Sequence, residues 1–139
     1  HSEGLDPASL IDSRYRWVLR QNGAGAQRFL LEVLSGYGTS ADRLNCVTTA
    51  LSEREAATGI AMGLADVAPG ARAAAAECGL AFIPFGWESF DLALPRSIWF
   101  RRLFQDLIAR LRSPASTAIA DQLTGYDLSE AGDLIWGAE

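Results

Sequence analysis

The most informative chemistry in the sequence lies in a glycine-rich segment between an expected strand and an expected helix. Residues 15–20 (YRWVLR) are rich in aromatic and branched side chains, which is typical of a strand, and a stretch with helical spacing begins near Gln27. The segment QNGAGA lies between them. Because a helix N-terminus presents unpaired N–H groups and partial positive charge, a strand-to-helix turn of this kind can bind an anion.

The glycine pattern itself is short. It is a single G-x-G, without the third glycine of a dinucleotide loop and without the Lys-Ser/Thr of a P-loop, so it supports neither nucleotide motif. The same glycines also suit a tight turn that needs a positive φ angle at Gly23 or Gly25. The local pattern favours this second interpretation, and the anion-binding interpretation stays open beside it.

A second group of hydroxyls follows the next expected strand, residues 44–49 (LNCVTT). Thr48 and Thr49 end that strand, and Ser52 opens S-E-R-E, a capping box with Glu55 at the third helical position. Carboxyl ends of parallel strands meet at one edge of a sheet, where open α/β folds bind ligands. Either threonine could therefore donate to the same anion, although local evidence favours threonines that pair within the sheet.

The remaining polar residues give little support for catalysis or metal binding. Asp66, in LADVAPG, ends a third expected strand and could accept a hydrogen bond from a ligand or cap a turn. There is no G-x-S-x-G motif, and the one histidine is His1, so a nucleophile with its base and a zinc site are both unsupported. Cys46 and Cys78 lie among apolar or small residues, which favours two buried, reduced thiols. We expect no enzyme activity, no metal and no cofactor.

Strands and helices alternate along the first half of the chain, which predicts an α/β fold with a largely parallel sheet. Further strands are expected at 64–68, 80–85 and 89–94, and helices at 27–35, 52–62, 71–78, 98–111 and 115–123, with Pro114 in the first turn of the last. The helix at 98–111 carries one apolar stripe, from Phe100 to Leu111, which predicts a core-facing surface.

Composition limits the class of protein. The 139 residues are 49% hydrophobic and 21% charged, which suits a globular domain and excludes a disordered chain. A net charge of −5 argues against direct binding of nucleic acid, which relies on clustered positive charge. No window approaches eighteen consecutive apolar residues, so no membrane span is expected.

Four blocks of sequence, in order, resemble one family. The run RYRWVLRQNGAGAQRFLLEVL resembles "R-F-V-N-R-Q-x-G-S-G-T-R" of periplasmic-binding-protein-like (PBP-like) domains that are themselves similar to molybdate-binding proteins. TTALSEREAATGIAMGLADVAPGARAAA resembles a stretch with an alanine-rich helix before "G-x-A-D-x-G-x-G". LAFIPFGWESFDLALPR and LRSPASTAIADQLTGYDLSEAGDL resemble "L-x-F-I-P-L-x-x-E-x-Y-D-L-x-I-P" and "L-R-S-P-x-F…G-Y-D-x-S-x-x-G". The resemblance places a ligand-binding domain at 14–133, after a leader (1–13) and before a tail (134–139).

The resemblance implies a type II two-lobed fold with one lobe nearly complete and the other partial. The stretch up to residue 85 would form most of one lobe, and residues 88–94 would cross back towards the other. A small anion such as molybdate or tungstate would be bound without a cofactor. Ala24 and Ala26 stand where the family often has Ser and Thr, so backbone N–H groups would be the donors. The residues implied in ligand binding are Gln21, Gly23, Ala24, Gly25, Ala26, Gln27, Thr48, Thr49 and Asp66.

The resemblance also implies a cellular role. Such bacterial domains are often fused behind a helix-turn-helix or excisionase-type DNA-binding domain, which implies a ligand sensor of a cytoplasmic transcriptional regulator. A transport-related protein, periplasmic if a signal peptide precedes this segment, is the alternative. Because the family's first-lobe elements would precede Leu5, we expect either a fragment or a homodimer in which a second copy covers the helices at 98–123. The alternative function is a domain without ligand that serves as a dimerisation or interaction module.

Overall fold

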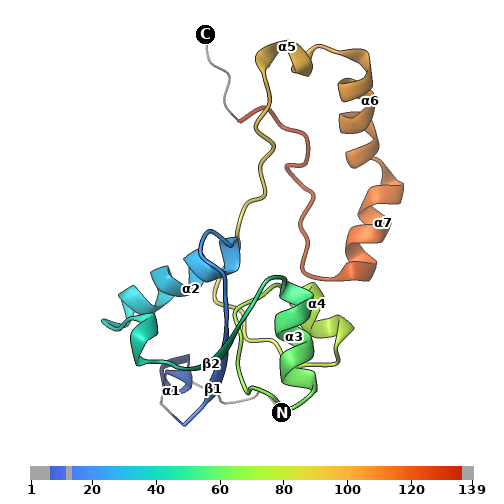
Figure 1. Ribbon diagram of the computed structural model, residues 1–139. Helices are drawn as coiled ribbons and strands as arrows, with labels where there is room; N and C mark the ends of the chain where they lie inside the picture. Colours follow the sequence, from blue (N-terminus) through green and yellow to red (C-terminus); the bar gives the residue numbers. More distant parts are fainter. Residues whose placement is uncertain (1–6, 12–13, 136–139) are drawn as a thin grey trace. The chain divides into compact units, whose positions relative to one another are not determined.

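The computed structural model describes residues 7–11 and 14–135 (Figure 1). The chain divides into two compact units, His1–Phe85 and Gly86–Glu139, which we describe separately. The first unit is a mixed α/β structure. Its elements are α1 (Pro7–Leu10), β1 (Arg16–Arg20), α2 (Gly25–Gly36), the 3-10 turn η1 (Ala41–Arg43), β2 (Asn45–Ala50), α3 (Glu53–Ala61) and α4 (Arg72–Glu77).

The sheet of the first unit is parallel, as expected from the alternation of elements. β1 pairs with β2 from Arg16↔Asn45 to Arg20↔Ala50, with an irregularity between Trp17 and Val18. The expected third strand is reduced to one parallel bridge between Val67 and Trp17, fixed by a hydrogen bond from the Val18 N–H to the Val67 carbonyl at 3.0 Å. β1 is therefore the central strand: β2 pairs along its length, and the bridge at Val67 lies beside its first residues.

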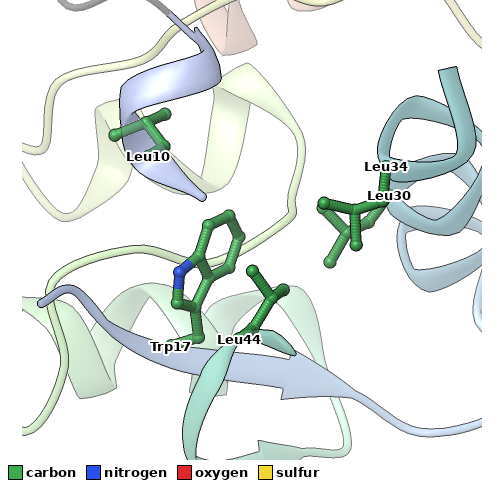
Figure 2. Packing of buried hydrophobic residues seen from close by; sticks show 5 residues of the cluster. All are labelled: Leu10, Trp17, Leu30, Leu34 and Leu44. Atoms are coloured by element: carbon green, nitrogen blue, oxygen red, sulfur yellow. The ribbon is translucent and has the colours of Figure 1, made fainter. Parts of the chain in front are cut away.

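The two faces of this sheet bury different side chains because successive strand residues point to opposite sides. One face packs large apolar residues against α1 and α2, and Figure 2 shows this cluster. Its buried members are Leu10, Trp17, Leu30, Leu34 and Leu44. The other face is covered by α3, with α4 beside α3 (Figure 1), and its cluster is built on small residues. Those buried members are Val18, Ala50, Ala56 and Ala65.

The small residues of α3 let this helix approach the sheet closely. A Cβ atom added at Gly59 would lie 3.4 Å from the Val18 side chain, which is van der Waals contact, so this face of α3 packs directly on β1. α2 and α3 thus cover opposite faces of the sheet, and both begin at its carboxyl edge.

The second unit is helical in its regular structure, with α5 (Arg96–Trp99), α6 (Arg102–Leu111) and α7 (Pro114–Leu123). The single helix expected at 98–111 is interrupted because Arg101 is extended (φ −75°, ψ 138°). The start of α7 agrees with the prediction, since Pro114 occupies its first turn and the Ser113 hydroxyl accepts a hydrogen bond from the Ser116 N–H. Arg112 donates from Nε to the Ala131 carbonyl (2.8 Å), which fastens residues 131–133 to the end of α6.

Several expectations for the second half of the chain are wrong. Residues 80–85 and 89–94 form no strand in the described structure, because a strand requires a partner and neither segment pairs with one. The stripe on α6 is not a core surface within its own unit, since Ile108 is the one buried residue of that helix. Phe100, Leu103 and Leu107 are exposed.

In the first unit, Cys46 is exposed, whereas a buried side chain was expected. Both cysteines are free thiols, as predicted.

Candidate functional site

Two strand-to-helix loops meet at the carboxyl edge of the sheet. The β1–α2 loop and the β2–α3 loop are adjacent because β1 and β2 are parallel neighbours. Gln21 joins them: its N–H donates to the Ala50 carbonyl (3.4 Å) and its side-chain amide donates to the Leu51 carbonyl (3.1 Å). The Gln21 side chain therefore holds the two loops together, and its predicted position at this edge agrees with the structure.

The glycine turn has the left-handed backbone that its interpretation as a tight turn required. Gly23 has a φ angle of +87°, and the turn is closed by a hydrogen bond from the Ala24 N–H to the Gln21 carbonyl (3.2 Å). Gly25 is the first residue of α2. The left-handed conformation belongs to Gly23, while Gly25 and Ala26 form the first turn of the helix.

The N-terminus of α2 has no side-chain cap. Ala24 is the N-cap residue and carries no acceptor, and the first turn contains no acidic residue. The first hydrogen bond of the helix is donated by the Arg28 N–H to the Ala24 carbonyl (3.0 Å), so the N–H groups of Gly25, Ala26 and Gln27 precede the intrahelical pattern. This end of α2 combines unpaired donors with the positive end of the helix dipole.

The neighbouring N-terminus of α3 is closed in the way the capping box predicted. The Ser52 hydroxyl accepts a hydrogen bond from the Glu55 N–H (3.0 Å), and the Glu55 carboxylate accepts one from the Leu51 N–H (2.8 Å). Glu53 adds a second carboxylate to this turn. Of the two helix N-termini at this edge, that of α2 can bind an anion, whereas the first turn of α3 already contains two carboxylates of its own.

Gln27 has a structural role that the sequence did not indicate. Its side chain is buried, and Oε1 accepts a hydrogen bond from the Arg20 N–H at 2.9 Å. This bond ties the end of β1 to the first turn of α2. The Gln27 side chain thus positions the glycine turn, while its backbone N–H remains at the helix end.

Thr48 and Thr49 lie within β2, opposite Val18 and Leu19, and both are exposed. Because consecutive strand residues face opposite sides of the sheet, their two hydroxyls do not point in the same direction. Thr49 is next to Ala50, the residue that Gln21 contacts. The structure thus places the threonines close to the loops, at the end of the strand rather than within them.

Asp66 lies at the other edge of the sheet, away from the remaining candidates. Its N–H donates to the carbonyl of Arg16, the first residue of β1 (2.8 Å), and its carboxylate accepts from the Arg16 guanidinium. These hydrogen bonds lower the pKa of Asp66 to about 2 and raise that of Arg16. The structure therefore separates Asp66 from the glycine turn, because the residue precedes its short strand instead of following it.

Arg20 is the residue of this edge that the prediction omitted. It is the last residue of β1, its side chain is only 8% exposed, and Nη1 lies 3.9 Å from a Glu53 carboxylate oxygen. Its Nε donates to Gln21 Oε1 over a long 3.4 Å. The available signal was an arginine directly before the glycine turn, at the end of a strand.

The described residues hold no group of three or more His, Cys, Asp or Glu side chains placed to bind a metal ion. Within the same part of the chain, no helix combines the length and the apolar character that crossing a bilayer requires.

A family model described as the PBP superfamily domain matches residues 2–112. The chain therefore belongs to the PBP superfamily. Proteins of this superfamily are typically binding proteins for small ligands rather than enzymes. No curated protein and no solved structure matches the chain significantly.

Proposed function

We propose that this PBP superfamily domain binds a small oxyanion of the molybdate or tungstate type at the N-terminus of α2. The observation that carries the proposal is the contrast between the two helix ends at the carboxyl edge. α2 begins without a side-chain cap and without an acidic residue, whereas α3 is capped by Ser52 and carries Glu53 and Glu55. Anions bind at uncapped helix ends through backbone N–H groups.

The donors of this site are main-chain groups. Ala24 and Ala26 offer no hydroxyl, so a tetrahedral oxyanion would accept hydrogen bonds from the N–H groups of Gly25, Ala26 and Gln27. Gly23 leaves the approach open, because no atom lies within 4 Å of the position that a Cβ would take there. Thr49, which precedes Ala50 in β2 and is exposed, is a candidate for a further hydroxyl donor.

The proposal is tested by closing this helix end with a side chain. An aspartate in Ala24→Asp would accept hydrogen bonds from the first turn, and should stabilise the protein by about 0.5–1 kcal/mol while abolishing anion binding. Ala24→Ser is the comparison variant: a serine can cap α2 as Ser52 caps α3, but it adds no negative charge, so it should weaken anion binding far less than Ala24→Asp does. Binding of molybdate, tungstate and sulfate is measured by isothermal titration calorimetry, and stability by urea denaturation.

Opposite changes in stability and affinity for Ala24→Asp support a site at the end of α2. Equal oxyanion affinity of Ala24→Asp and the unmodified protein would contradict it, as would the absence of binding in the unmodified protein and in a variant with Ser and Thr restored at positions 24 and 26.

As part of the same proposal, the domain senses its ligand within a cytoplasmic transcriptional regulator, where ligand binding is transmitted to an attached DNA-binding domain. The family resemblance supports this context. Expression of the gene's neighbours with and without molybdate, in a strain that carries Ala24→Asp, would test it.

A second candidate function is an interaction module, and a specific observation favours it. The second unit exposes many large apolar side chains, while its buried apolar residues are Ile108 and Ala120. The most exposed include Trp87, Phe90, Phe100, Leu103 and Ile135. Exposed apolar surface of this extent is typical of protein interaction sites. Sedimentation equilibrium distinguishes the candidates, since a dimer that Leu103→Glu dissociates supports the module and a monomer at high concentration contradicts a homodimer.

A further inference from the structure

We propose that the exposed face of α6 is a homodimer interface, in which two copies of this chain pair their α6 helices antiparallel and Arg102 of each copy lies opposite Asp106 of the other. The inference goes beyond oxyanion binding and rests on the second candidate function, an interaction module. It adds the surface, the occupant and the relative direction of the two helices.

The exposed face of α6 consists of an apolar stripe with one charged edge. Leu103 is 83% exposed and Leu107 is 45% exposed, and both lie on one side of the helix because they are four residues apart. Arg102, Asp106 and Arg110 are also exposed and four residues apart, so they form a charged row beside the stripe. Within the described residues, none of these three side chains takes part in an ion pair.

The opposite edge of the stripe is covered by the second unit itself. Ile108 is buried, and Phe104 and Leu111 are half-buried. The Phe104 ring also packs beside Trp99, with ring centroids 5.8 Å apart. A second copy can therefore approach the stripe and the charged row, but not this opposite edge.

The presence of charge on one edge determines the direction of pairing. In a parallel helix pair each edge faces the unlike edge of the other helix, whereas in an antiparallel pair like edges face each other. An antiparallel pair can place Leu103 of one copy beside Leu107 of the other. This register brings Arg102 opposite Asp106 of the second copy, and the two-fold axis repeats the contact.

The charge of Arg102 is poorly placed in the isolated helix. Arg102 is the first residue of α6, where the helix dipole disfavours a positive charge, and the first turn contains no acidic residue. Asp106 of a second copy would bring a negative charge to this turn. The sign of the charges alternates along the row, so the row is complementary to itself when it is reversed, as a two-fold interface requires.

The size of this surface predicts a weak dimer. A helix of 10 residues is only about 15 Å long, so a pair of such helices forms an interface at the low end of the usual range. We expect a dissociation constant on the order of 10–100 μM, which corresponds to association in concentrated solution and dissociation on dilution.

Charge reversal tests the pairing. Arg102→Asp sets two carboxylates against each other at each contact, and Asp106→Arg does the same with two guanidinium groups. Either substitution should weaken the homodimer by about tenfold, and by less in 0.5 M sodium chloride, where salt screens exposed charges. An equimolar mixture of the two variants should restore association as a heterodimer, because each contact again joins opposite charges.

Sedimentation velocity of the full chain, up to about 200 μM, measures association, and native mass spectrometry identifies the heterodimer. The matched controls are Asp42→Arg and Arg43→Asp, which change the net charge by the same amounts at exposed positions of η1 in the first unit. Both controls should associate as the unmodified protein does. The unfolding midpoint of every variant is measured as well, and it should stay unchanged because the substituted side chains are exposed.

The outcomes separate this inference from the function on which it rests. If the unmodified protein is a dimer that neither charge reversal weakens, the copies pair through another surface or in parallel; the inference is then wrong, and the interaction module stands. Weakening by both variants without recovery in the mixture would also overturn the inference. A monomer at 200 μM would contradict the inference and the homodimer together, while oxyanion binding is decided by its own titration.

Discussion

Asp66 accepts three hydrogen bonds from Arg16, one from the backbone N–H at 2.9 Å and two from the guanidinium, from Nε at 3.0 Å and from Nη2 at 2.8 Å. The pair joins Arg16, the first residue of β1, to the short segment that pairs with β1 through Val67. The Asp66 carboxylate thus links the two segments at the amino edge of the sheet, which is the edge opposite to the glycine turn. This arrangement keeps Asp66 fully engaged within the fold.

The first prediction concerns the pH dependence that this pair imposes. The pKa of Asp66 is lowered to about 2 by its hydrogen bonds to Arg16, against roughly 3.9 in an unfolded chain. Its stabilising effect is therefore present above pH 4 and is lost as the pH falls towards 2. Asp66→Asn should lower the urea midpoint at pH 7, and the two proteins should converge between pH 4 and pH 2.

The coupling of the two side chains provides the control for that experiment. In the double variant Arg16→Met/Asp66→Asn, the second substitution should cost less than it does alone, because the interaction is already lost. Additive effects at pH 7, or a difference between Asp66→Asn and the unmodified protein that persists to pH 2, would show that the hydrogen bonds to Arg16 do not stabilise the fold.

The second prediction concerns Gln27. Its buried Oε1 accepts the Arg20 N–H, so Gln27→Ala leaves a buried donor without a partner and should lower the free energy of unfolding by about 1–3 kcal/mol. Gln27→Glu keeps an acceptor at the same place and should cost less. Urea denaturation of both variants at pH 7 measures the difference, and equal losses would mean that the hydrogen bond contributes little.

The third prediction concerns the glycine turn. Gly23 has a φ angle of +87°, which an L-residue adopts at a cost of about 1–2 kcal/mol, so Gly23→Ala should be destabilising by that amount. Gly36 is the matched control, because it ends α2 without a positive φ angle and no atom lies within 4 Å of its added Cβ. Gly36→Ala should be neutral or stabilising by up to about 1 kcal/mol. Similar losses in both variants would contradict this account of the turn.

The first half of the fold could be predicted because its signals are local. The capping box at Ser52 and Glu55 fixed the start of α3, and the glycine turn at Gly23 separated β1 from α2. Both depend on interactions within a few residues, which a sequence displays directly. The parallel sheet followed from the alternation of strands and helices.

Long-range pairing could not be predicted from local pattern. Residues 89–94 alternate apolar and polar side chains as a strand does, yet in the described chain no partner strand pairs with them. Asp66 was placed at the wrong edge of the sheet because its strand is a single bridge at Val67, one residue after it. Arg20 was missed for a related reason: its burial and its distance from Glu53 depend on the packing of α3 against β1.

The last prediction concerns Gly132, which lies where the C-terminal segment packs against α6. It has a φ angle of +81°, and a Cβ added there would lie 2.7 Å from the Ile108 side chain and 3.1 Å from Arg112 Nε. Ile108 is the one buried residue of α6, and Arg112 donates to the Ala131 carbonyl. Gly132 therefore packs against the two residues that hold the C-terminal segment on α6. Gly132→Ala should cost roughly 2 kcal/mol or more, from the backbone strain and the close contact together. Faster hydrogen exchange of the α6 amides, with unchanged exchange in β1, would show the loss in the second unit. Unchanged exchange in α6 would mean that residues 131–133 do not stabilise that helix.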